Sequence, residues 1–175
     1  FWVETDVVNS LPAISIVGLP DTSVNEARDR VKSAIKNSGY TFPSRKVVIN
    51  LAPADLKKNG TSFDLPIAVG VLIEEEVLKQ EDVEGYAFIG ELSLDGLIRG
   101  VSGVLPLVLG LKEAGIKNII VPKSNAKEAA LIEDVNIYGA EHLTDVVNHF
   151  VETRIPQTKV DVRKYLAEQV EQTPL

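Results

Sequence analysis

The stretch DLKKNGTSFDLPIAVG, residues 55–70, places two lysines, a glycine and a serine immediately before an apolar run. The run is too apolar for a surface helix and predicts a buried core helix that begins after the loop. Asp64 is a favourable N-cap with Pro66 then in the first turn, and Thr61 with Asp64 is a competing capping arrangement. The loop could bind a phosphate, present a nucleophilic serine, contact a partner or simply begin the helix.

The composition is that of one soluble globular domain. The chain has 175 residues, of which 45% are hydrophobic and 25% charged. No stretch approaches about 18 uninterrupted apolar residues, and the N-terminus lacks a secretory signal, so we expect a cytoplasmic protein with no membrane partner. The absence of cysteine excludes disulfides, zinc–thiolate sites and thiol catalysis. Because the chain begins at Phe1 in a strand-like run, we expect it to be a piece of a longer protein.

Charge is distributed unevenly. The net charge of −7 argues against a protein that binds nucleic acid over its whole surface. Residues 1–60, however, carry eight Lys/Arg and six Asp/Glu, whereas the remainder carries ten and nineteen. A local basic face near residues 45–58 is therefore one interpretation, and ordinary solubilising surface charge is the other.

Strand and helix patterns alternate along the chain and predict an α+β (mixed α/β) fold in one domain. Ser23 and Glu26 fit a capping box for the first helix, and Gly39 ends it. Asp95-Gly96 predicts a hairpin turn. The predicted strands are 1–8, 12–18, 45–52, 86–94, 97–101, 117–122 and 135–140, and the later predicted helices are 104–115, 125–133, 141–151 and 160–170. Residues 152–175 are polar and predict a linker or docking arm.

Several chemistries lack their residues. The lysines at 57–58 precede Gly60 instead of following a second glycine, so no phosphate-binding Walker A loop is present. His142 and His149 lie seven apart on one predicted helix, roughly 10 Å, which is too far to share a metal ion. We interpret both as surface histidines and predict no metal site. A Ser-His-Asp triad fails for the same reason.

The motifs KNGTS (58–62), GELSLDG (90–96) and AGIKNIIVP (114–122) are similar to the proteolytic domain of Lon-type AAA+ proteases. The resemblance puts Ser62 at the position of the catalytic serine. Extending the pattern without gaps puts Leu105 at the position of the catalytic lysine, and Lys112 lies two turns further on. A leucine cannot accept the serine proton, so the resemblance implies a broken Ser-Lys dyad and no catalytic residue.

The longer motifs VGLPD, NLAPADLKK, FDLP and GELSLDG resemble the N-terminal domain of the Mg-chelatase-like AAA+ ATPases of the ComM/YifB family over residues 1–151. The resemblance implies the ribosomal protein S5 domain 2-like, or Lon proteolytic-domain-like, fold. It implies a non-catalytic accessory domain beside a hexameric AAA+ motor that binds ATP and Mg and promotes DNA branch migration in natural transformation. This chain itself would then hold no cofactor, and residues 152–175 would lead towards the motor.

Three hypotheses follow for this chain. The first is a module for assembly of a homohexameric ring, in contact with its own motor and neighbouring subunits. The second is a surface for single-stranded or branched DNA, with Arg45, Lys46, Lys57 and Lys58 contacting phosphates without recognising sequence. The third is a Lon-type peptidase domain with residual hydrolase activity, in which Ser62 uses a lysine from elsewhere.

Overall fold

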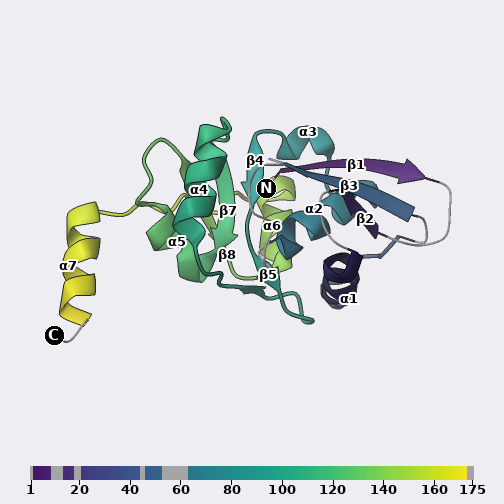
Figure 1. The fold of residues 1–175 in the computed structure, drawn as a ribbon, viewed down its shortest axis with the longest axis horizontal. Coiled ribbons are helices and arrows are strands. Elements are labelled where there is room, and N and C mark those ends of the chain that lie inside the picture. Colours follow the sequence, from purple (N-terminus) through teal and green to yellow (C-terminus); the bar gives the residue numbers. More distant parts are fainter. Residues whose placement is uncertain (1, 9–13, 18–20, 44–45, 53–62, 173–175) are drawn as a thin grey trace.

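Two three-stranded sheets organise the chain (Figure 1). A computed structural model describes residues 2–8, 14–17, 21–43, 46–52 and 63–172. The strands are β1 (Trp2–Val8), β2 (Ile14–Val17), β3 (Lys46–Ala52), β4 (Tyr86–Phe88), β5 (Glu91–Leu92), β6 (Ile98–Arg99), β7 (Asn118–Pro122) and β8 (Asn136–Ala140). The helices are α1 (Asp21–Asn37), α2 (Asp64–Glu74), α3 (Gln80–Val83), α4 (Val104–Glu113), α5 (Lys123–Ala129), α6 (Leu143–Val151) and α7 (Val162–Gln172). This is the mixed α/β class that the sequence predicts.

The N-terminal sheet has the order β1-β3-β2. β1 runs antiparallel to β3 along its whole length, with Trp2 opposite Ala52, and β2 runs parallel to β3, with Ile14 opposite Val47. The Val-Val-Ile run of β3 thus lies in a strand with neighbours on both sides, where β-branched residues are favoured.

Helix α1 is placed by its apolar stripe and by its C-terminal glycine. Its fully buried residues are Ala27, Val31, Ala34 and Ile35. Gly39 has a φ of 89°, and the chain closes there with Tyr40 N donating to Ile35 O at 3.0 Å. The predicted capping box is wrong, because the helix already begins at Asp21 and Ser23 lies inside it. An aspartate is itself favoured in a first turn, so the pattern fits more than one start.

Helix α2 lies at the centre of the molecule, between the two sheets (Figure 1). Every residue from Asp64 to Leu72 is buried, and the helix contacts α1, β1, β3, β4 and β5. The prediction of a buried core helix in this stretch is confirmed.

The C-terminal sheet is parallel, with the order β4-β7-β8, and separates two apolar clusters. Alternate strand residues point to opposite faces, so the same strands supply both clusters. The first cluster takes Phe88, Ile120 and Tyr138 together with residues of α1, α2 and α6. The second takes Ala87, Ile119 and Ile137 together with residues of α4 and α5.

The predicted hairpin forms around Asp95-Gly96, where Gly96 has a φ of 90°. Its strands are shorter than predicted because the run 86–94 divides into β4 and β5 at Gly90. A side chain at Gly90 would approach Ile98 Cγ2 to 2.8 Å, and Leu65 N donates to Gly90 O at 3.0 Å. The chain therefore leaves one sheet here and enters another.

The polar C-terminal segment begins on the body of the domain. Thr158 N donates to Ile137 O at 2.7 Å, and Gln157 bridges to Tyr138 at the free edge of β8. We call residues 152–158 the C-terminal strap. Beyond it, α7 stands away from the body, as Figure 1 shows in yellow. The predicted helix over 160–170 is confirmed as α7.

Candidate functional site

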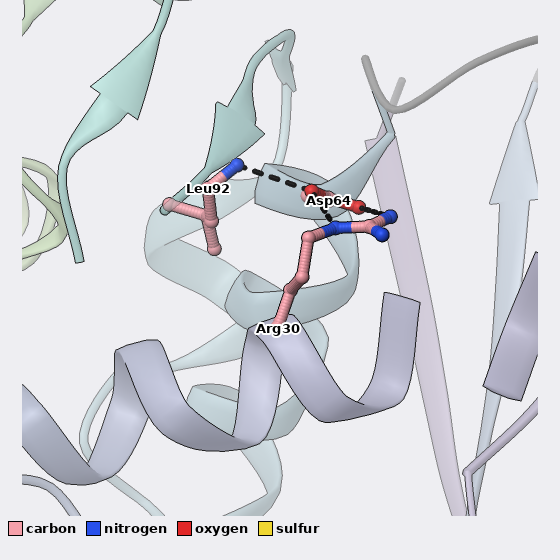
Figure 2. Close-up of polar contacts among 3 residues, drawn as sticks. All are labelled: Arg30, Asp64 and Leu92. Carbon is pink, nitrogen blue, oxygen red and sulfur yellow. Dashed lines mark hydrogen bonds and ion pairs between the residues drawn. The ribbon is translucent and has the colours of Figure 1, made fainter. Parts of the chain in front are cut away.

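A buried ion pair forms at Asp64, the first residue of α2 (Figure 2). Asp64 is fully buried, and its Oδ2 and Oδ1 accept hydrogen bonds from Arg30 Nε at 2.9 Å and Nη2 at 3.0 Å. Leu92 N donates to Asp64 Oδ2 at 3.1 Å. One carboxylate thus joins α1, α2 and β5.

The predicted capping role of Asp64 is wrong. The N-cap position belongs to Phe63, which makes no side-chain capping bond, and Asp64 is the first helical residue. Pro66 does lie in the first turn, as predicted. The carboxylate leaves the helix end because Arg30 offers it two charge-assisted bonds in a buried position. Nothing in the spacing of 34 residues between Arg30 and Asp64 signals this pair in the sequence.

Two effects act in opposite directions on the ionisation of this pair. Burial raises the pKa of Asp64 above its ordinary value, while the hydrogen bonds from Arg30 and Leu92 favour the charged form. The bond to Asp64 raises the pKa of the Arg30 guanidinium. Three N–H groups aimed at the two oxygens fit an ionised carboxylate, which accepts at both atoms and donates at neither.

Of the serine and lysine positions of the Lon resemblance, the structure describes only the lysine position. Ser62 lies outside the described residues. Leu105 is half-buried on α4 and packs against the second apolar cluster. Lys112 lies on the same helix, with its Nζ 4.0 Å from Asp134 Oδ2. Leu105 therefore serves as a packing residue in the described structure.

The predicted basic contacts are reached only in part by the structure. Arg45, Lys57 and Lys58 lie outside the described residues. Lys46 is the first residue of β3, and its backbone pairs with Val8. The side chain of Lys46 is not described. The proposal for these four residues stays a prediction from the sequence.

The interpretation as a surface residue is wrong for His149. His149 is 3% exposed. Its Nε2 lies 3.1 Å from Tyr86 Oη, and its Nδ1 accepts a hydrogen bond from Ile155 N at 2.9 Å. Burial, with a contribution from Arg154, lowers the pKa of His149 to about 4. A neutral ring with its proton on Nε2 satisfies both bonds.

His142 does not lie inside α6, the helix that contains His149. It is half-buried and is the N-cap residue of that helix. It makes a capping box with Asp145, and its Nε2 lies 2.9 Å from Asp95 O in the hairpin turn. An acidic residue three positions after His142 is the sequence signal for this cap, although histidine is an unusual capping residue.

Two open pockets flank the ion pair of Lys123 and Glu141, whose atoms Nζ and Oε1 lie 2.7 Å apart. They measure about 260 and 430 Å³ and adjoin the carboxyl ends of β7 and β8. Within the described ranges, no three His, Asp or Glu side chains are grouped to hold a metal ion. Nor does any helix there have the length and apolar content needed to cross a membrane.

A protein-family model described as subunit ChlI of Mg-chelatase matches residues 3–125. The chain belongs to this family. The match covers α1, the ion pair at Asp64 and the hairpin, together with α4 and β7. It therefore includes Ser62, Leu105 and the four predicted basic contacts, whereas His142 and His149 lie beyond it.

Individual relatives narrow the family. The uncharacterized protein YifB of Salmonella typhimurium is 49% identical over 144 residues, which are 82% of this chain and 28% of that protein. Competence protein ComM of Haemophilus influenzae is 43% identical over 145 residues, 83% of this chain and 28% of that protein. These matches confirm the ComM/YifB resemblance. The chain spans little more than a quarter of the length of these relatives.

The Lon resemblance is more distant. Lon protease of Leptospira interrogans is 26% identical over 135 residues, which are 75% of this chain and 16% of that protein. The chain is thus a Mg-chelatase-like member of the ComM group with a remote likeness to Lon proteases.

Proposed function

We propose that this chain is the non-catalytic N-terminal accessory domain of a ComM-type Mg-chelatase-like AAA+ ATPase. Its tasks would be assembly of a homohexameric ring and guidance of single-stranded or branched DNA. ATP and Mg would bind in the motor of the full-length protein, which would promote branch migration during transformation. The observation that carries the proposal is the identity of 43% with competence protein ComM over 83% of this chain.

The packing of Leu105 supports the non-catalytic part. A Ser-Lys hydrolase needs a lysine amine close enough to remove the serine proton. Leu105 instead lies half-buried against the second apolar cluster, where a hydrocarbon side chain is stable and cannot act as a base. The accessory role would then rest on surfaces and on the attached motor.

The test of DNA guidance is fluorescence anisotropy of labelled single-stranded and forked DNA with the 175-residue chain at low and physiological salt. We expect binding that falls steeply with salt and is lost in Lys57→Glu/Lys58→Glu. The control is Lys117→Glu/Lys127→Glu, which changes the net charge equally at two lysines that the structure shows to be exposed. Absence of binding at low salt would remove DNA guidance and leave ring assembly.

The likeness to Lon protease gives a second candidate, a residual hydrolase at Ser62. Labelling of Ser62 by a serine-reactive phosphonate, lost in Ser62→Ala, would favour it. Peptidase activity that is unchanged by Ser62→Ala would exclude it. The result expected from Leu105 is no labelling.

A further inference from the structure

Helix α1 carries a column of basic side chains on one side. Arg28, Lys32 and Lys36 follow one another at intervals of four residues. Each interval advances roughly 6 Å along the helix and turns about 40° around it, so the three side chains lie on neighbouring positions of one face. Arg28 and Lys32 are half-buried and Lys36 is exposed. We call these three residues the α1 basic stripe.

Within the part of the chain that the structure describes, no carboxylate pairs with the stripe. Among the described residues, Arg28, Lys32 and Lys36 make no ion pair. Lys32 Nζ lies 5.8 Å from the centre of the Phe42 ring, a cation–π contact that leaves the ammonium available to an anion. Arg30, which lies between Arg28 and Lys32 in sequence, is instead bound to Asp64.

Acidic groups gather on a different side of α1. Arg30 faces Asp64 and is influenced by Glu91, and Asn37 Nδ2 donates to Leu94 O beside Asp95. Arg30 and Asn37 mark the side towards the hairpin, which at 3.6 residues per turn lies roughly 150° around the helix from the stripe. Glu26, exposed, lies near that side, and exposed Asp29 lies next to the stripe.

The ring beside Lys32 is close in sequence to two of the basic residues predicted to contact DNA. Phe42, beneath Lys32, lies three positions before Arg45 and four before Lys46. In a chain with a net charge of −7, three cations on one helix side, unpaired among the described residues, are a local surface for an anion. The three residues of the stripe, spaced four apart, extend over about 12 Å of α1. One DNA strand presents a phosphate about every 3.4 Å of its helix axis.

We propose that the α1 basic stripe is the surface on which this chain holds the phosphate backbone of a nucleic acid strand. The inference rests on the proposed guidance of DNA and adds its location. Cations contact phosphates, and among the described residues no aromatic ring beside the stripe is free to stack on a base. Such contacts are independent of the nucleic acid sequence. Asp29 would weaken the same contact by repulsion.

The experiment compares three new variants, together with Lys57→Glu/Lys58→Glu, with the wild-type 175-residue chain, using labelled oligodeoxythymidine and a series of salt concentrations. The test variant is Arg28→Gln/Lys32→Gln/Lys36→Gln, since glutamine keeps a similar helix propensity. The control removes three exposed cations elsewhere, in Lys117→Gln/Lys127→Gln/Lys164→Gln. The third variant is Asp29→Asn. Circular dichroism verifies that each variant is folded.

We expect the test variant to bind about tenfold or more weakly at low salt, with the slope of log K against log salt reduced by about 2 for three lost phosphate contacts. Asp29→Asn should bind more tightly, and the control should keep most of the slope. A test variant that keeps the wild-type slope, while Lys57→Glu/Lys58→Glu abolishes binding, would overturn the stripe and leave DNA guidance standing. A wild-type chain without binding would overturn both.

Discussion

Asp64 and Arg30 are unequal partners in their ion pair. The Asp64 side chain is wholly buried, whereas the Arg30 side chain keeps 24% of its surface exposed. Removing the arginine therefore strands a carboxylate without its counter-charge, while removing the carboxylate leaves a guanidinium that can reach water. Isolated buried charges are far more costly than paired ones.

We predict that Arg30→Leu lowers the free energy of unfolding by about 3 kcal/mol near neutral pH. The loss should shrink as the pH falls. Without Arg30 the pKa of Asp64 in the folded state lies further above the unfolded value, so the folded state binds the extra proton and gains stability on acidification. Urea unfolding of the variant between neutral and mildly acidic pH measures this.

The control for Arg30→Leu is the double variant Arg30→Leu/Asp64→Asn, which keeps an acceptor for Leu92 N but has no charge to titrate. Its stability relative to wild type should not recover on acidification. Equal pH profiles for the single and the double variant would show that Asp64 is not the titrating group.

His149 gives the fold a dependence on pH of the opposite sign. Its pKa is about 4 in the folded protein, against 6.5 for an ordinary histidine. Between these values the unfolded chain holds a proton that the folded chain lacks. The contribution is therefore fully present above pH 6.5 and is lost as the pH falls towards 4, at up to about 1.4 kcal/mol per pH unit.

We predict that the imidazole signal of His149 titrates near pH 4 in NMR spectra of the folded protein. His149→Asn retains an acceptor for Ile155 N and should lose less stability than wild type between neutral pH and pH 5. A midpoint near 6.5 would mean that the ring is open to water and that Ile155 is not bonded to it.

At the scale of elements, local signals predicted what local chemistry decides. Gly39, Gly96 and Gly115 all adopt positive φ at the turns where the sequence places them. The capping box of Ser23 and Glu26 is a local signal that was wrong, whereas the other misjudged features depend on partners distant in sequence. Asp64 finds Arg30, and His149 finds Tyr86, 63 residues away. Both residues carry polar groups whose role only tertiary packing reveals, and a spacing rule along the chain gives neither.

The C-terminal strap and α7 differ in how they are held. Ile155 packs against the first apolar cluster, its N–H is bonded to His149, and Thr158 adds a bond to β8. Helix α7 exposes Val162 and Leu166 by 42% and 52% and stands away from the body (Figure 1). An isolated helix of this length is marginal in water.

We therefore predict that ending the chain after Lys159 leaves the melting temperature nearly unchanged, whereas ending it after Glu152 lowers it by several degrees. The second truncation exposes Ile155's apolar site and leaves Ile137 O and His149 Nδ1 without their donors. Thermal unfolding followed by circular dichroism compares the two. Equal melting temperatures would mean that the strap adds nothing to the domain.

At the scale of the whole molecule, the alternation of strands and helices predicted the fold class. It did not predict how the strands are distributed between the sheets. The sequence predicts one run over 86–94, whereas Gly90 sends β4 into the parallel sheet and β5 into the hairpin. At the candidate site, the start of a buried helix was predictable. Its support, a carboxylate shared by three elements, was not.

The two apolar clusters should melt together. They lie on opposite faces of the same three strands, and Leu107 packs against both. Leu72→Ala in the first cluster and Leu111→Ala in the second each remove a fully or almost fully buried side chain, at about 2–5 kcal/mol. We predict that each variant shifts a single calorimetric transition to lower temperature, because the strands cannot keep one face packed after losing the other. A transition that splits in only one variant would instead show two independently folding units, and the chain would have to be described as two domains.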